Sequence, residues 1–195
     1  MITRATLSTI EQGLPKYRSM LAGNTAFIPT SYESIATVSV GGGGAANVDF
    51  TSIPATYTHL QIRGIGKFSG GDGLGVRVGN GSIDTGSNYA VHVLQGDGSS
   101  ASASGSSSQT KMTLGYDFQE FGPFVLDILD YANTNKYKTF RALSGNDNNG
   151  SGYVQFRSGL WQSTSAINEI RLYGSLSSVN FSQYSHFALY GIKGA

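Results

Sequence analysis

Residues 127–145, DILDYANTNKYKTFRALSG, contain two short stretches rich in apolar residues on either side of a segment rich in Asn and Tyr. Residues 153–174, YVQFRSGLWQSTSAINEIRLYG, and residues 181–195, FSQYSHFALYGIKGA, show the same kind of pattern. Apolar and polar residues alternate with a period of two, and Gly, Asn or Ser closes each stretch. This pattern is typical of antiparallel β-strands joined by turns. The C-terminal third of the chain therefore predicts several consecutive strands.

The alternation extends back to residue 32. In residues 57–65, for example, Leu60 and Ile62 are expected to face the core, while Gln61 and Arg63 face solvent. No sustained helical period follows residue 31. Strands are predicted over residues 33–40, 46–51, 57–65, 74–78, 89–94, 111–116, 124–129, 137–143, 153–161, 168–173 and 186–192. So many short strands, without the Cys–Trp–Cys pattern of an immunoglobulin domain, favour an all-β antiparallel sandwich of the jelly-roll type over residues 32–195.

The composition excludes several classes of partner. The formal net charge is +1, so no electrostatic attraction to nucleic acid or to a membrane surface is expected. No apolar run approaches the roughly 20 residues that a membrane-spanning helix needs. The chain has no cysteine, which excludes disulfides and thiolate metal sites. Charged residues are only 13% of the chain, which suits a surface partly covered by neighbouring proteins.

Residues 1–31 differ from the rest of the chain. They contain two of the four prolines and show little alternation. The segment is too short to form a core of its own, so it is predicted to be an attachment arm that lies on another protein; a disordered leader is the alternative. The candidate attachment residues are basic, aromatic or aliphatic: Arg4, Leu14, Lys16, Tyr17, Arg18, Met20 and Leu21.

Residues 96–110, GDGSSASASGSSSQT, have almost no apolar side-chain area. Burial cannot offset the entropy of ordering such a segment. We therefore expect a long surface loop here, and long loops in compact domains are often functional or mobile.

No group of residues has the spacing of a catalytic or metal site. Asp127 and Asp130 are three residues apart, which places them on opposite faces of a strand. The histidines, His59, His92 and His186, lie in separate predicted strands, and a zinc site needs three ligands on one face. The sequence therefore predicts a protein that is not an enzyme, with no catalytic residue, cofactor or bound metal.

Aromatic residues make up 11% of the chain, mostly Tyr and Phe. One interpretation is that Phe fills the core and Tyr surrounds a subunit interface, where Tyr is enriched. The other is a platform on which sugar rings stack. The residues considered for such a platform are Tyr131, Tyr137 and Tyr184, with Trp161, Tyr153 and Tyr173 as the candidate surface-binding residues.

Several phrases resemble segments of virion structural proteins of tailed bacteriophages, especially phages of cyanobacteria and other aquatic hosts. They are residues 32–42 (YESIATVSVGG), 50–64 (FTSIPATYTHLQIRG), 84–110, 128–145, 159–172 (GLWQSTSAINEIRL) and 181–195. Residues 13–24, GLPKYRSMLAGN, are similar to leaders in that group. The group carries no catalytic motif, so the resemblance transfers no site residue.

The resemblance implies a homotrimeric β-sandwich protein located on the virion. One expected role is that of a capsid decoration (cement) protein, which docks on the major capsid protein through its N-terminal arm. The alternative is a tail fibre or adhesin module, with tail adaptor or fibre proteins and a host surface glycan as partners. The modest length of the domain and the absence of coiled-coil heptads favour decoration.

Overall fold

Twelve β-strands and no helix form the part of the chain described by the computed structural model, which covers residues 31–70, 72–175 and 179–194. No helix in these ranges could therefore span a membrane. The candidate attachment residues between Arg4 and Leu21 lie outside the described residues. The strands are β1 (Tyr32–Ser39), β2 (Asn47–Phe50), β3 (His59–Gly66), β4 (Leu74–Gly79), β5 (Tyr89–Gly96), β6 (Ala101–Gln109), β7 (Met112–Gly115), β8 (Gly122–Leu129), β9 (Lys138–Asp147), β10 (Gly152–Trp161), β11 (Glu169–Gly174) and β12 (His186–Ile192).

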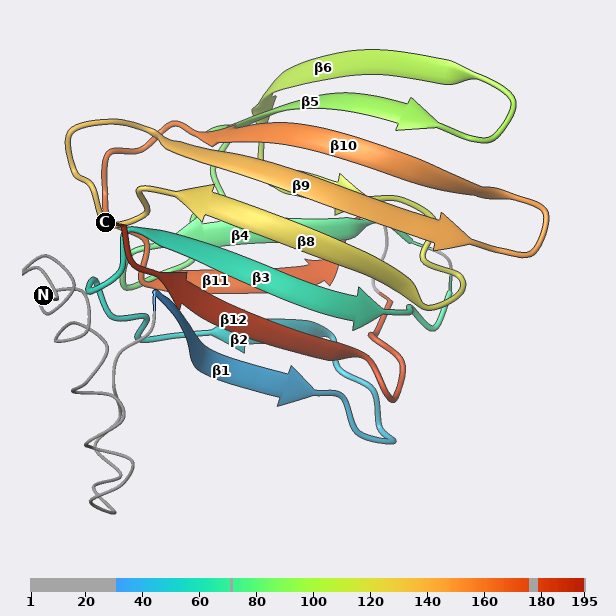
Figure 1. Ribbon diagram of the computed structural model, residues 1–195, viewed down its shortest axis with the longest axis horizontal. Helices are drawn as coiled ribbons and strands as arrows, with labels where there is room; N and C mark the ends of the chain where they lie inside the picture. The colour runs from blue at the N-terminus through green and yellow to red at the C-terminus, as the bar shows by residue number, and fades with distance from the viewer. Residues whose placement is uncertain (1–30, 71, 176–178, 195) are drawn as a thin grey trace, which may run out of the picture. The chain divides into compact units, whose positions relative to one another are not determined.

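The strands form two antiparallel sheets that pack face to face (Figure 1). The larger sheet has the order β1-β12-β3-β8-β9-β10-β5-β6, and the smaller has the order β2-β11-β4-β7. If the hairpins β5–β6 and β9–β10 are set aside, the eight remaining strands, renumbered in chain order, read 1-8-3-6 and 2-7-4-5. This is the strand order of a jelly roll, so the predicted all-β sandwich of jelly-roll type is confirmed.

The two hairpins enlarge only the larger sheet. They add four consecutive strands beyond β8, and β5 and β6 form the end of the sheet that projects at the top of Figure 1. Strand β7, the edge of the smaller sheet, contacts β8, β9, β10 and β5. It therefore covers the inner face of the enlarged sheet as far as β5, whereas every residue of β6 is exposed.

The core fills the space between the sheets. Strand β3 contributes Leu60 and Ile62, which are both fully buried as predicted, while Arg63 is exposed on the outer face. Across the core, Val76 and Val78 of β4 are also buried. The alternation in the sequence thus reflects one face of each sheet being covered and the other remaining in water.

The predicted long loop at residues 96–110 is wrong. Residues Ala101–Gln109 form β6, which pairs antiparallel with β5 in register from Gly96↔Ala101 to Tyr89↔Gln109, with one bulge. Every side chain of β6 is exposed. The strand is held by backbone hydrogen bonds to β5 and not by burial, which is why the apolar pattern gave no signal for it.

Candidate interaction surface

An apolar strip crosses the outer face of the larger sheet, which the smaller sheet does not cover. Its large members are Ile65, Leu94, Leu143, Val154 and Phe156, whose exposed fractions range from 41% to 66%. Together they leave roughly 500 Å² of apolar surface in water, within the range of about 300–600 Å² for the largest patch on a typical monomer, which is often functional. The smaller members are Pro123, Val125 and Ala103.

The strip is continuous because its residues stand opposite one another on neighbouring strands. Val125 of β8 pairs with Leu143 of β9, and Leu143 pairs with Phe156 of β10. Phe156 in turn pairs with Leu94 of β5, and Leu94 with Ala103 of β6. Directly opposed residues have Cβ atoms about 5 Å apart, so these side chains contact across five adjacent strands.

Beside the strip the outer face carries polar side chains, several of which pair with one another. Asp127 of β8 forms an ion pair with Arg141 of β9 (Nη2–Oδ2 3.0 Å) and accepts a hydrogen bond from Gln61 of β3 (2.7 Å). Tyr32 and Tyr190 stack with their ring centroids 4.9 Å apart. This network borders the strip, so the sheet face carries an apolar region beside a polar region, as the core and rim of a protein interface do.

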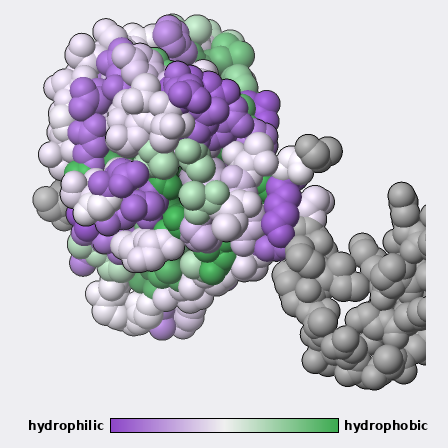
Figure 2. All heavy atoms as spheres, turned by 90° about the vertical axis from the view of Figure 1, so that its left-hand side faces the viewer, coloured by the Kyte–Doolittle hydropathy of each residue, from purple (hydrophilic) through white to green (hydrophobic). Residues whose placement is uncertain are grey.

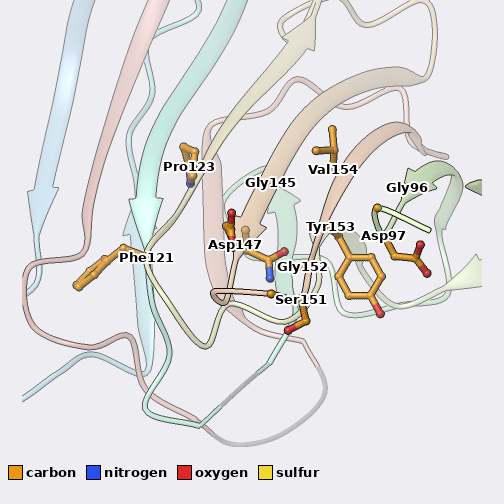
Figure 3. Close-up of a pocket in the computed structure, with 13 residues that line it drawn as sticks. Gly96, Asp97, Phe121, Pro123, Gly145, Asp147, Ser151, Gly152, Tyr153 and Val154 are labelled. Carbon is orange, nitrogen blue, oxygen red and sulfur yellow. The ribbon is translucent and has the colours of Figure 1, made fainter. Parts of the chain in front are cut away.

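A shallow hollow of about 560 Å³ adjoins the strip at the turns of the two inserted hairpins. Pro123, Gly145 and Val154 belong both to this hollow and to the strip's own depression. Figure 3 shows Asp97 and Tyr153 on one flank of the hollow and Phe121 and Pro123 on the other. The end of the sandwich opposite to these turns faces the viewer in Figure 2 and shows mainly hydrophilic and intermediate residues around a small apolar area.

The two carboxylates of the hollow stabilise its turns. Asp97 accepts hydrogen bonds from the backbone N–H groups of Ser99 (2.9 Å) and Ser100 (2.7 Å), and these bonds lower the pKa of Asp97. Asp147 accepts a hydrogen bond from the backbone N–H of Asn149 (2.9 Å). The Ser100 hydroxyl also donates to Asp97 (3.1 Å to Oδ2). Both aspartates are exposed, so the hollow can offer carboxylate acceptors to a polar ligand, with the Tyr153 ring beside them.

The three candidate surface-binding aromatics lie in different environments, and only one of them lines the hollow. Trp161 is only 3% exposed, and its indole N–H donates to Asp84 Oδ2 (2.7 Å), so its ring does not face solvent. Tyr173 is partly buried, with its ring under the Arg77 guanidinium (4.9 Å). Only Tyr153 lines the hollow. Of the other tyrosines, Tyr131 is fully buried, whereas Tyr137 and Tyr184 are 50% and 74% exposed.

The acidic residues and the histidines do not converge in the described part of the chain. Asp130 lies beside Lys136 and His59, and Glu120 forms an ion pair with Lys67 (3.0 Å). The Nδ1 atom of His59 accepts a hydrogen bond from the backbone N–H of Asp130 (3.0 Å). No group of three metal-ligating side chains is found among the described residues.

Sequence reasoning did not identify the apolar strip, although one signal was present. Residues 124–129 are apolar on both faces of the predicted strand apart from Asp127. Leu143 extends this two-sided pattern to β9, whose inward residues Phe140 and Ala142 are also apolar. A strand that is covered on one side only needs apolar residues on that side alone. Apolar residues that also face the other side therefore indicated a second covered face.

Comparison of the chain with protein-family models, with curated proteins and with solved structures finds no match. The resemblance to phage virion proteins therefore stays a prediction.

Proposed function

We propose that this chain is a non-enzymatic structural protein of a virion, a homotrimeric capsid decoration (cement) protein. The observation that carries the proposal is the apolar strip, since a contiguous exposed apolar patch of this size is often functional and suits a protein–protein contact. The structural roles of Asp127, Asp130, Asp97 and Asp147 agree with a protein that binds and does not catalyse. The phage-like phrases support the location on a virion.

In this role the sandwich and the arm would act together on the major capsid protein. Packaged DNA pushes outward on a capsid shell, and the shell yields where its subunits meet. A trimer whose arms, residues 1–31, each lie on a different capsid subunit would add buried area across those seams. An interface of about 1,600 Å² in total is sufficient for specific docking.

Immunogold labelling of intact particles, with an antibody raised against folded residues 32–195, tests the location. Label over the head is expected. Label on the tail alone would replace decoration by host recognition, and unlabelled particles would contradict the virion role, provided that the antibody binds the folded protein. Deletion of residues 1–31 should abolish binding to capsids while leaving the sandwich folded.

The hollow beside Tyr153 supports a second candidate function, a tail fibre or adhesin module that binds a host surface glycan. An aromatic ring next to exposed carboxylates suits a sugar, whose apolar face stacks and whose hydroxyl groups donate. Under this function, Tyr153→Ala should reduce adsorption of the purified protein to host cells. Tyr137→Ala, an exposed tyrosine that does not line the hollow, is the matched control.

A further inference from the structure

We propose that copies of this chain associate through the apolar strip, so that the outer face of β8, β9, β10 and β5 is buried against a second copy. The inference rests on the proposed function only for the expected number of copies, three. It assigns to the contact a face that a jelly roll of eight strands would not have, because the inserted hairpins supply most of the strip.

The first argument is that none of the described residues of the same chain covers the strip. Leu143 lies between the buried residues Ala142 and Ser144 and points away from the core. Phe156 likewise alternates with the buried Gln155 and Arg157. These two large apolar side chains are 55% and 45% exposed, so they contribute little to the folding of a single copy.

The second argument is the size of the strip. One side of a standard interface buries about 800 Å², of which about 65% is apolar when identical subunits associate. That share is about 520 Å², close to the roughly 500 Å² that the large side chains of the strip expose. The strip is thus large enough to be the apolar centre of a contact between copies.

The third argument is charge. The strip contains no charged residue, and the neighbouring Asp127 and Arg141 already neutralise each other. Identical surfaces that meet around a symmetry axis bring the same residues together, so a charged strip would repel its own copy. The exposed Arg63 stands opposite Val125 at the border of the strip and donates to Gln61. The centre of the strip, around Leu143 and Phe156, is uncharged and meets no such repulsion.

The fourth argument is the exposed edge of the same sheet. Strand β6 has nine exposed residues, with neither a proline nor a charged side chain, and it forms the outer edge beside the strip. Sheet edges in monomeric proteins usually carry a charge or a proline, which blocks pairing with another chain. A bulge, which also hinders pairing, is present in β6 between Ser106 and Gln109. The rest of this edge has no such device and is protected if a second copy lies over it.

The test measures the mass of the full-length protein by sedimentation equilibrium over a wide concentration range. The chain has a mass of 20.6 kDa, and about three times that value is expected. Leu143→Asp and Phe156→Asp should each raise the dissociation constant roughly a hundredfold or more, because each places a carboxylate in the centre of the contact. Thr139→Asp, on the same face of β9 and outside the strip, should leave association unchanged.

Fluorescence of the buried Trp161 will verify that each variant is folded, which is expected because residues 143 and 156 are exposed in one copy. A wild-type protein that remains monomeric at all concentrations overturns the inference. So does an oligomer that Leu143→Asp and Phe156→Asp leave intact. A dimer dissociated by these variants supports the contact and corrects the number of copies. Particle labelling is independent of this result, so the virion role can fail while the contact stands.

Discussion

Replacement of Lys138 by Met should destabilise the protein strongly, because this lysine joins two loops from inside the fold. Its side chain is fully buried, and burial lowers its pKa. Its ammonium group donates hydrogen bonds to the backbone carbonyls of Asn133, Lys136 (3.0 Å) and Thr164 (3.1 Å). Met keeps the length and the apolar stem of the side chain and removes only the charge and the three donors.

The magnitude follows from those three bonds. At about 1–1.5 kcal/mol for each hydrogen bond, Lys138→Met should lower the free energy of unfolding by about 3–4.5 kcal/mol. Total stabilities are only about 5–15 kcal/mol, so this is a large fraction. With a slope of about 2 kcal/mol per molar urea, the unfolding midpoint should fall by roughly 1.5–2 M.

Urea unfolding monitored by Trp161 measures this change, since Trp161 is the only tryptophan and is 3% exposed. All proteins are compared at one concentration, because association would also stabilise the folded state. Lys136→Met is the matched control: Lys136 is 57% exposed and contacts Asp130 on the surface, so it should cost less than about 1 kcal/mol. A Lys138→Met midpoint within about 0.3 M of the wild type, or equal losses in both variants, would refute the role of the carbonyl contacts.

The remaining predictions concern pH and packing. Burial raises the pKa of Tyr89 and of Tyr131 in the folded protein. In the unfolded chain both tyrosines begin to ionise near pH 10, whereas in the folded protein they are still neutral at that pH. Stability should be unaffected by these groups below that pH and fall above it, by up to about 1.4 kcal/mol per pH unit for each tyrosine; Tyr131→Phe should make the fall less steep. Gly64→Ala should lower the free energy of unfolding by about 1–3 kcal/mol, because a Cβ atom there would lie 2.4 Å from a buried Phe124 ring atom. Gly43→Ala, where a Cβ atom would have no other atom within 4 Å, should be nearly neutral. Thermal unfolding will compare the two variants. Equal effects of the two alanines would contradict the packing argument.

The strands could be predicted from sequence where one face is buried and the other is wet. The inward Leu60 and Ile62 and the outward Gln61 and Arg63 follow this rule, and the last strand, residues 186–192, was predicted with its observed bounds. Strand β6 could not be predicted this way, because its alanine, serine and glycine residues are exposed on both faces and only backbone pairing to β5 orders them.

Which side chains of β10 face the core could not be predicted, because two of the residues that face inward are polar. Gln155 and Arg157 face the core, where Arg157 Nη1 donates to Thr113 and its guanidinium lies 4.3 Å from the centroid of the Tyr116 ring. Trp161 shares this phase and is therefore buried, against the expectation that it lies on the surface. The apolar Val154 and Phe156 take the opposite phase and face outward. Hydropathy alone assigns the two phases of such a strand the wrong way round.

The two inserted hairpins explain why the candidate surface lies where it does. Eight strands already complete the two layers of the jelly roll, and the four added strands enlarge one layer only. Strand β7 covers part of their inner face, whereas no strand of the described part of the chain covers their outer face. Apolar side chains on an uncovered face add little to folding and expose the protein to aggregation. Their alignment across five adjacent strands, together with the low share of charged residues, is therefore accounted for if the enlarged layer exists to be buried against another protein.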